Sequence, residues 1–135
     1  MPIPESQVAA VVSEVSRRMS EPGYAQLAIG GFAQSHPDAG RYITAHLDEL
    51  GGGEAVMHAV FHAEVLNECF RRHLERELPP VRFADLDAAA KAGDPIERLR
   101  ASEPALADYV ASNVDVDAMR RVLALVALAM SRAAR

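Results

Sequence analysis

The sequence predicts an all-α protein, a single domain over residues 1–135 built as a bundle of about six to eight helices. Three observations favour this class. Apolar residues recur at helical spacing along almost the whole chain. No stretch alternates apolar and polar residues as a half-buried strand does, and no Asn-Gly hairpin turn occurs. Groups of glycine and proline divide the chain into helical segments.

The first half of the chain contains four predicted helices. An apolar stripe that starts at Val8 ends at the Ser20–Gly23 break. Ser35 followed by Pro37 is typical of a helix start, because serine caps a helix and proline fits its first turn. The three glycines at 51–53 separate the last two helices of this half. The helices after the first are predicted over residues 22–34, 37–50 and 53–77.

The second half contains shorter helices and one central helix. Leu78-Pro79-Pro80 ends the preceding helix, because proline is poorly tolerated in a helix interior. Val122–Met130 are all apolar, which indicates a last helix that is buried on nearly every side. This run is shorter than the roughly 20 residues that span a bilayer. Helices are predicted over 83–92, 95–102, a segment that begins at Pro104, and 116–134.

The two halves resemble each other in sequence. Ser35-His36-Pro37 is followed 67 positions later by Ser102-Glu103-Pro104, and Tyr42 falls on Tyr109 at the same offset. We therefore consider two duplicated helical units, around 22–77 and 94–134, with an internal repeat over 29–63 and 96–130. Independent use of serine and proline at helix starts is the alternative explanation.

Composition excludes several classes of function. The formal net charge of −5 disfavours binding to nucleic acid or to an anionic membrane surface, because both need concentrated Lys and Arg. Cys69 is the only cysteine, so neither an intramolecular disulfide nor a cysteine zinc cage is expected. The first residues lack the basic and apolar pattern of a secretory signal, and we expect a cytoplasmic protein.

Four reactive side chains share one edge of the predicted helix 53–77. At 100° per residue, His58, His62, Cys69 and His73 fall within about 60° of one another. If helices 37–50 and 53–77 pack antiparallel across the glycine turn, further groups join them. In that arrangement His46 faces His58, Tyr42 faces His62, and Glu54 lies one turn before His58.

This cluster favours a divalent transition metal as the cofactor, if it acts as a site. Histidines at i and i+4 place both rings over one patch, and His46, His58 and His62 make a three-histidine ligand set with Glu54 and Tyr42 as additional groups. Acid–base catalysis by His62 beside Tyr42 and a Cys69 nucleophile are further hypotheses. The structural alternative is that these histidines only form hydrogen bonds at a helix border.

Two functions follow as hypotheses. No nucleophile elbow, phosphate loop or dinucleotide fingerprint occurs, so the sequence favours a non-enzymatic interaction or scaffold module that forms a homo-oligomer or binds a protein partner. The alternative is the histidine-lined metal or small-molecule site on the hairpin of 37–50 and 53–77. The sequence predicts no reaction and no substrate.

Overall fold

The computed structural model describes residues 2–135 and confirms the all-α class. Nine helices and no strand occur in this part of the chain. One more helix is present than the sequence predicted, because the predicted helix 37–50 is divided in two. The helices are α1 (Glu5–Arg18), α2 (Tyr24–Ser35), α3 (Pro37–Ala45), α4 (Leu47–Leu50), α5 (Gly53–Leu74), α6 (Phe83–Lys91), α7 (Pro95–Ser102), α8 (Pro104–Asn113) and α9 (Asp117–Ala133).

His46 divides the predicted helix into α3 and α4. Its backbone leaves the helical conformation (φ −96°, ψ 21°), and its N–H bonds the carbonyl of Ile43. The Nδ1–H of the ring donates to the Tyr42 carbonyl at 2.8 Å, which satisfies a carbonyl that the helix end leaves free. This histidine therefore ends α3 with its own side chain.

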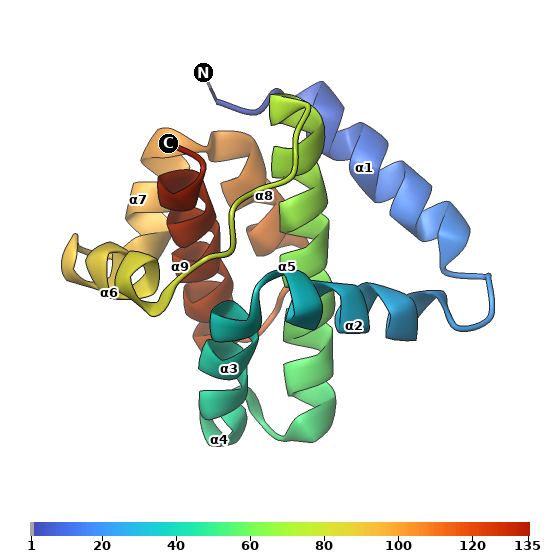
Figure 1. The fold of residues 1–135 in the computed structure, drawn as a ribbon, viewed down its shortest axis with the longest axis horizontal. Coiled ribbons are helices and arrows are strands. Elements are labelled where there is room, and N and C mark those ends of the chain that lie inside the picture. Colours follow the sequence, from blue (N-terminus) through green and yellow to red (C-terminus); the bar gives the residue numbers. More distant parts are fainter. Residues whose placement is uncertain (1) are drawn as a thin grey trace.

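α5 and α9 form the centre of the molecule (Figure 1). Every residue from Val122 to Ala127 is buried, as the apolar run predicted. α5 ends three residues earlier than predicted, at Leu74, because Glu75 takes a left-handed conformation (φ 56°) of the kind that terminates helices. The turn before α5 uses Gly51 and Gly52 at positive φ, where other residues would be strained.

The other helices are arranged around this pair with an approximate twofold pattern. α1 and α2 pack on α5, whereas α6 and α7 pack on α9 (Figure 1). In addition, α1 contacts α8, and α6 contacts α3. Each outer pair of helices thus covers one central helix and reaches an element from the opposite half. We use "first half" for residues 2–74 and "second half" for residues 75–135.

Two corners in these halves have the same backbone geometry. His36 joins α2 to α3 with φ −134° and ψ 69°, and Glu103 joins α7 to α8 with φ −139° and ψ 71°. Both are followed by a proline that starts the next helix. Core positions also correspond at the offset of 67. The pairs in which both residues are buried include Phe32 and Leu99, Ala39 and Leu106, Ile43 and Val110, Val56 and Leu123, Ala59 and Val126, and Ala63 and Met130.

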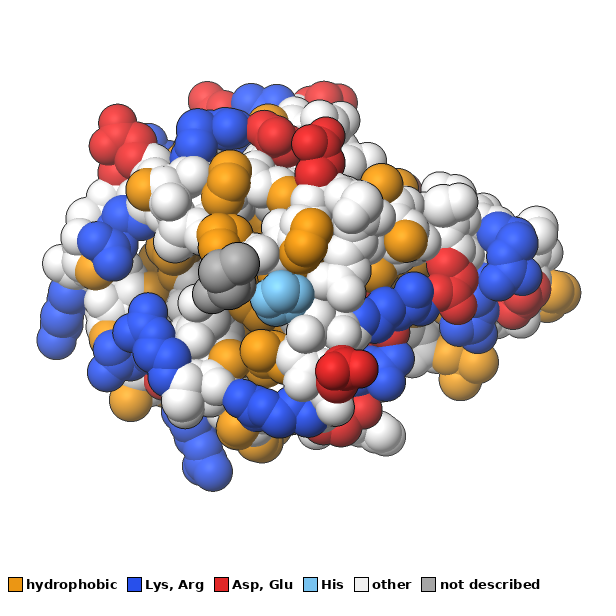
Figure 2. Space-filling model, turned by 90° about the horizontal axis from the view of Figure 1, so that it is seen from above, with side chains coloured by type: hydrophobic (Ala, Val, Ile, Leu, Met, Phe, Trp, Pro, Cys, Tyr) orange, Lys and Arg blue, Asp and Glu red, His pale blue; other side chains and the backbone are white. Residues whose placement is uncertain are grey.

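The surface carries both signs of charge. On the face drawn in Figure 2, Lys and Arg side chains are interspersed with Asp and Glu, and apolar side chains lie singly or in small groups between them. Among the helices of residues 2–135, none combines the length and apolar character that a membrane span requires.

Candidate functional site

The three predicted metal-ligating histidines point to different surroundings. His46 lines a cavity of about 390 Å³ between α4 and α9, together with Tyr42, Arg121 and Leu125. It therefore lies beside residues of α9, and the position opposite His58 stays a prediction. His58 itself is exposed on α5. The ring of His46 turns back onto Tyr42 of α3, which it contacts through Nδ1 and through its face.

His62 is held by a tyrosine from the second half. Its Nδ1 lies 2.8 Å from the hydroxyl of Tyr109 on α8, and the two rings meet edge-on. Burial lowers the pKa of His62, and the neighbouring His58 lowers it further. Burial also raises the pKa of Tyr109, so its phenol stays protonated. The sequence predicted a tyrosine at this place but selected Tyr42, which lies 67 positions earlier.

No metal centre is assembled by the described residues. Within residues 2–135, no group of three or more His, Cys, Asp and Glu side chains is placed so that it could hold an ion. Glu54 is exposed in the first turn of α5, and the ring of Tyr42 packs on His46 at 4.6 Å between centroids. The proposed ligand set of His46, His58 and His62 thus has no support from this geometry.

Cys69 is a core residue. It is fully buried, and burial raises its pKa to about 12. A nucleophilic cysteine needs the opposite, a lowered pKa in an accessible place. His73, the nearest predicted partner along the helix, donates from Nδ1 to the Gln7 side chain of α1 at 3.1 Å.

A buried polar chain that the sequence analysis missed begins at His36. Its Nδ1 accepts the Val81 N–H at 3.0 Å, so the ring proton is on Nε2, which donates to the Asn67 side chain at 2.9 Å. Asn67 in turn donates from Nδ2 to Glu64 at 2.9 Å. Burial lowers the pKa of His36 and raises that of Glu64. The neutral imidazole therefore fixes Asn67, and Asn67 fixes the carboxyl group of Glu64.

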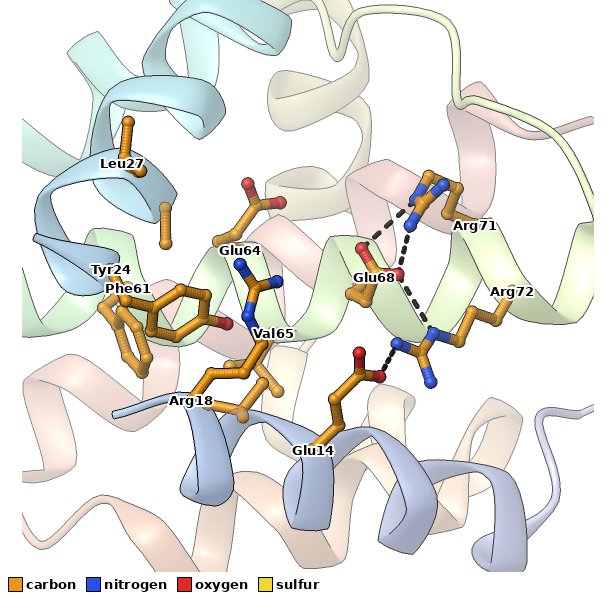
Figure 3. A pocket seen from close by; sticks show the side chains of 12 residues that line it. Glu14, Arg18, Tyr24, Leu27, Phe61, Glu64, Val65, Glu68, Arg71 and Arg72 are labelled. Carbon is orange, nitrogen blue, oxygen red and sulfur yellow. Dashed lines mark hydrogen bonds and ion pairs between the residues drawn. The ribbon is translucent and has the colours of Figure 1, made fainter. Parts of the chain in front are cut away.

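This chain ends in a cleft of about 280 Å³ between α1, α2 and α5, which we call the α1/α2 cleft (Figure 3). Its aromatic side chains, Tyr24 and Phe61, meet edge-on at 6.3 Å between centroids. Three glutamates and three arginines complete the charged lining. They are Glu14, Arg18, Glu64, Glu68, Arg71 and Arg72.

Most charges of the cleft pair with one another. Arg71 and Arg72 both donate to Glu68, from Nε atoms at 3.1 and 3.0 Å. Arg72 also pairs with Glu14 across the gap between α5 and α1 (Figure 3). Glu68 keeps a lowered pKa: burial opposes ionisation, but the hydrogen bonds from Arg71 and Arg72 outweigh it. The ion pairs fasten α1 to α5 along one wall of the cleft.

A second concave region, the α3 groove, is apolar. It has a volume of about 670 Å³ and lies between α2, α3 and α5. Small residues such as Ala33, Gly40 and Ala45 line it, and the Met57 side chain on its rim is 49 % exposed. Arg41 is the charged residue in this lining.

α2 borders the α3 groove and carries no charged residue. Its sequence, YAQLAIGGFAQS, contains no Asp, Glu, Lys or Arg, although such residues make up 24 % of the chain. Its outer side is nevertheless accessible. Leu27 is 74 % exposed, and a Cβ added at Gly30 would meet nothing within 4 Å.

Comparisons with protein-family models, with curated proteins and with solved structures found no match to this chain.

Proposed function

We propose that the protein is a non-enzymatic interaction module, and that the partner of its α2 face is a second copy of the same chain. The α2 face consists of the outer side of α2 and the adjoining α3 groove. The main observation in favour is the accessible helix without charge. A helix that faces only water normally carries charged side chains there, whereas helix–helix interfaces favour small and apolar ones.

The residue types of the face suit close packing of two helices. Gly30 and Ala33 are exposed on α2 and have almost no side chain. Leu27 and Met57 supply large exposed apolar side chains beside them. A stable dimer buries roughly 800 Å² per subunit, which is more than one short helix provides, so the α3 groove has to be covered as well.

The distribution of charge indicates where two copies can meet. The chain has a net charge of −5, so two copies repel each other over most orientations. Because α2 has no charged residue and Arg41 is the charged residue in the groove lining, the α2 face brings few like charges together. A symmetric dimer also needs a patch that is complementary to itself, and here a protruding Met57 borders an apolar groove.

We also infer that α1–α5 and α6–α9 are two copies of one helical unit. Three observations support this. The corners at His36 and Glu103 have the same backbone geometry, and buried positions match between the halves. In addition, α1 contacts α8 of the second half and α6 contacts α3 of the first. The second half then serves as an internal reference. Its position equivalent to Ala33 is Arg100, and its groove, lined by Ile96, Ala107 and Ala124, has only about 120 Å³.

The proposal is tested by sedimentation velocity from about 1 µM to about 1 mM protein, the range of weak to moderate self-association. We expect a reversible monomer–dimer equilibrium in the wild-type chain. Ala33→Arg, which introduces the residue found in the second half, should shift the chain to monomer. Val116→Arg is the matched control, because Val116 is also an exposed apolar residue (47 %) but precedes α9 and does not line the α3 groove.

A wild-type chain that remains monomeric over the whole range contradicts the proposal. Equal weakening of the dimer by Ala33→Arg and Val116→Arg also contradicts it, because the effect would then come from added charge and not from the α2 face.

A further inference from the structure

The α1/α2 cleft has a counterpart in the second half. A smaller cleft of about 120 Å³ lies between α6, α7 and α9. At the offset of 67, Phe61 corresponds to Leu128 and Glu64 to Ser131, and both of these line the smaller cleft. Gly31 corresponds to Arg98, which lines it too. In the second half, therefore, an arginine lines the cleft at the position where the first half has a glycine.

Gly31 leaves space directly beside a carboxylate. A Cβ at this position would lie 3.6 Å from Oε2 of Glu64, an ordinary contact distance. The other oxygen, Oε1, accepts from Asn67, which is itself fixed by His36. Oε2 therefore faces Gly31 of α2, and the Glu64 side chain is one of those that line the cleft (Figure 3).

Glu64 has no ion-pair partner within residues 2–135, in contrast to the other two glutamates of the cleft. The guanidinium groups of Arg71 and Arg72 pair with Glu68, and Arg72 also pairs with Glu14. Arg18 pairs with Glu21 at 3.5 Å. A half-buried carboxylate without a cation is costly, and a bound cation would remove that cost.

The aromatic wall is suited to the same ligand. Arg18 places its guanidinium carbon 4.4 Å from the centroid of the Tyr24 ring, so this wall already accepts a planar cation on one side. Phe61 meets Tyr24 edge-on at the base of the cleft. Aromatic rings beside a carboxylate are a common arrangement for guanidinium and ammonium recognition.

We propose that the α1/α2 cleft binds an organic cation, a guanidinium or primary ammonium group, that pairs with Oε2 of Glu64 and packs against Tyr24 and Phe61. The cation lies beside Gly31, at the position where the second half carries the Arg98 side chain. It comes either from a free small molecule or from an arginine side chain of a bound polypeptide. This proposal does not depend on dimer formation through the α2 face.

The test is isothermal titration of the full chain with two probes. Agmatine represents a free guanidinium compound, and a capped peptide with one central arginine represents a polypeptide source. We expect agmatine to bind with a Kd on the order of 1 mM or lower. A peptide that binds at least tenfold more tightly identifies the polypeptide source, and a peptide of equal or weaker affinity identifies the free compound.

Two neighbouring substitutions give a matched pair. Gly31→Arg fills the space beside Glu64 and should abolish agmatine binding. Gly30→Arg adds the same charge one residue earlier, where the added side chain meets open space, and should leave binding unchanged. Glu64→Gln keeps the shape of the side chain and its acceptor for Asn67, and should weaken agmatine at least tenfold.

Absence of agmatine binding to the wild-type chain overturns the proposal, as does unchanged binding in Glu64→Gln. The same pair of variants separates cation binding from dimer formation. Gly30→Arg should weaken the dimer without affecting agmatine, because Gly30 lies on the α2 face. Circular dichroism of each variant establishes that it is folded before the titration.

Discussion

His36 and Glu103 occupy equivalent corners of the two halves, and each accepts a backbone N–H from an extended segment of the opposite half. Val81 donates to Nδ1 of His36 at 3.0 Å, and Ile3 donates to a carboxylate oxygen of Glu103 at 2.8 Å. Both side chains are buried, at 1 % and 7 % exposure. The two halves are therefore joined twice by the same kind of contact, once through an imidazole and once through a carboxylate.

The imidazole contact should make stability depend on pH. Burial lowers the pKa of His36 below its ordinary value of 6.5, so the native state holds the ring neutral. The contribution of His36 to stability is fully present above pH 6.5 and is lost as pH falls from there through the native pKa, by up to about 1.4 kcal/mol per pH unit. Urea unfolding at pH 7.5, 6.5 and 5.5 measures this slope.

His36→Gln is the comparison for this slope. The variant should be less stable at pH 7.5, because the glutamine side chain reproduces the hydrogen bonds of the imidazole to Val81 and Asn67 imperfectly. It should lose less stability on acidification. Equal slopes in both proteins would show that another group controls the acid response.

The carboxylate contact should respond in the opposite direction. Burial raises the pKa of Glu103, against the opposing hydrogen bond from Ile3, so the native state favours the protonated form. This contribution is present below the ordinary value of 4.5 and is lost as pH rises through the native pKa. Glu103→Gln keeps an acceptor and should match or exceed wild-type stability at pH 7.

Glu103→Ala completes that series. It leaves the Ile3 N–H without its acceptor, so we expect a loss of about 1–3 kcal/mol in the free energy of unfolding. If Glu103→Gln destabilises the protein as much as Glu103→Ala at pH 7, the charge itself is needed and the argument is wrong.

The contribution of the His62–Tyr109 hydrogen bond to stability can be measured by comparison with Tyr42, the tyrosine at the equivalent position of the first half. Tyr109→Phe removes the phenol that bonds Nδ1 of His62, and we expect a loss of about 1–2 kcal/mol. Tyr42 lies at the equivalent position, but its hydroxyl makes no hydrogen bond within residues 2–135. Tyr42→Phe should therefore cost clearly less, and equal losses would contradict the role assigned to Tyr109.

Cys69 should react only when the protein unfolds. The fully buried thiol, with its pKa raised to about 12, is neutral at pH 8 and inaccessible to a disulfide reagent. Labelling kinetics in native buffer and in urea check this. Rapid modification of the native chain would restore the hypothesis of a reactive cysteine.

Divalent metals should not stabilise the native state. The Nδ1 atoms of His46 and His62 are engaged by Tyr42 and Tyr109, and His58 is exposed on its own. We expect thermal unfolding to be unchanged by zinc or nickel, and no stoichiometric metal in untagged protein. A stabilisation that disappears in a His58→Ala, His62→Ala variant would reinstate the histidine site.

The helices could be predicted from the sequence because their boundaries are set locally. Pro95 and Ser102 bound α7 where the sequence placed it, and the glycines at 51–53 make the predicted turn. The break at His46 was missed, since it depends on a ring that bonds the carbonyl four residues earlier. Nothing in the apolar spacing distinguishes that conformation from a continuous helix.

The candidate sites could be predicted only in part, because they depend on which helices meet. The antiparallel register placed Tyr42 opposite His62, but the phenol that reaches this ring comes from α8, 47 residues later in the chain. For His36 the sequence predicted only a position at the start of a helix. Its partners Asn67 and Val81 lie 31 and 45 residues away, and no local pattern links them.

The crossed contacts of Ile3 and Val81 have a consequence for folding. Each corner takes one hydrogen bond from the opposite half, at Nδ1 of His36 and at the carboxyl group of Glu103. A chain with only one half ordered therefore loses that bond. Partly unfolded forms are therefore disfavoured, and opening should be cooperative. Amide exchange at Ile3 and Val81, which belong to different halves, should report the same global free energy of unfolding.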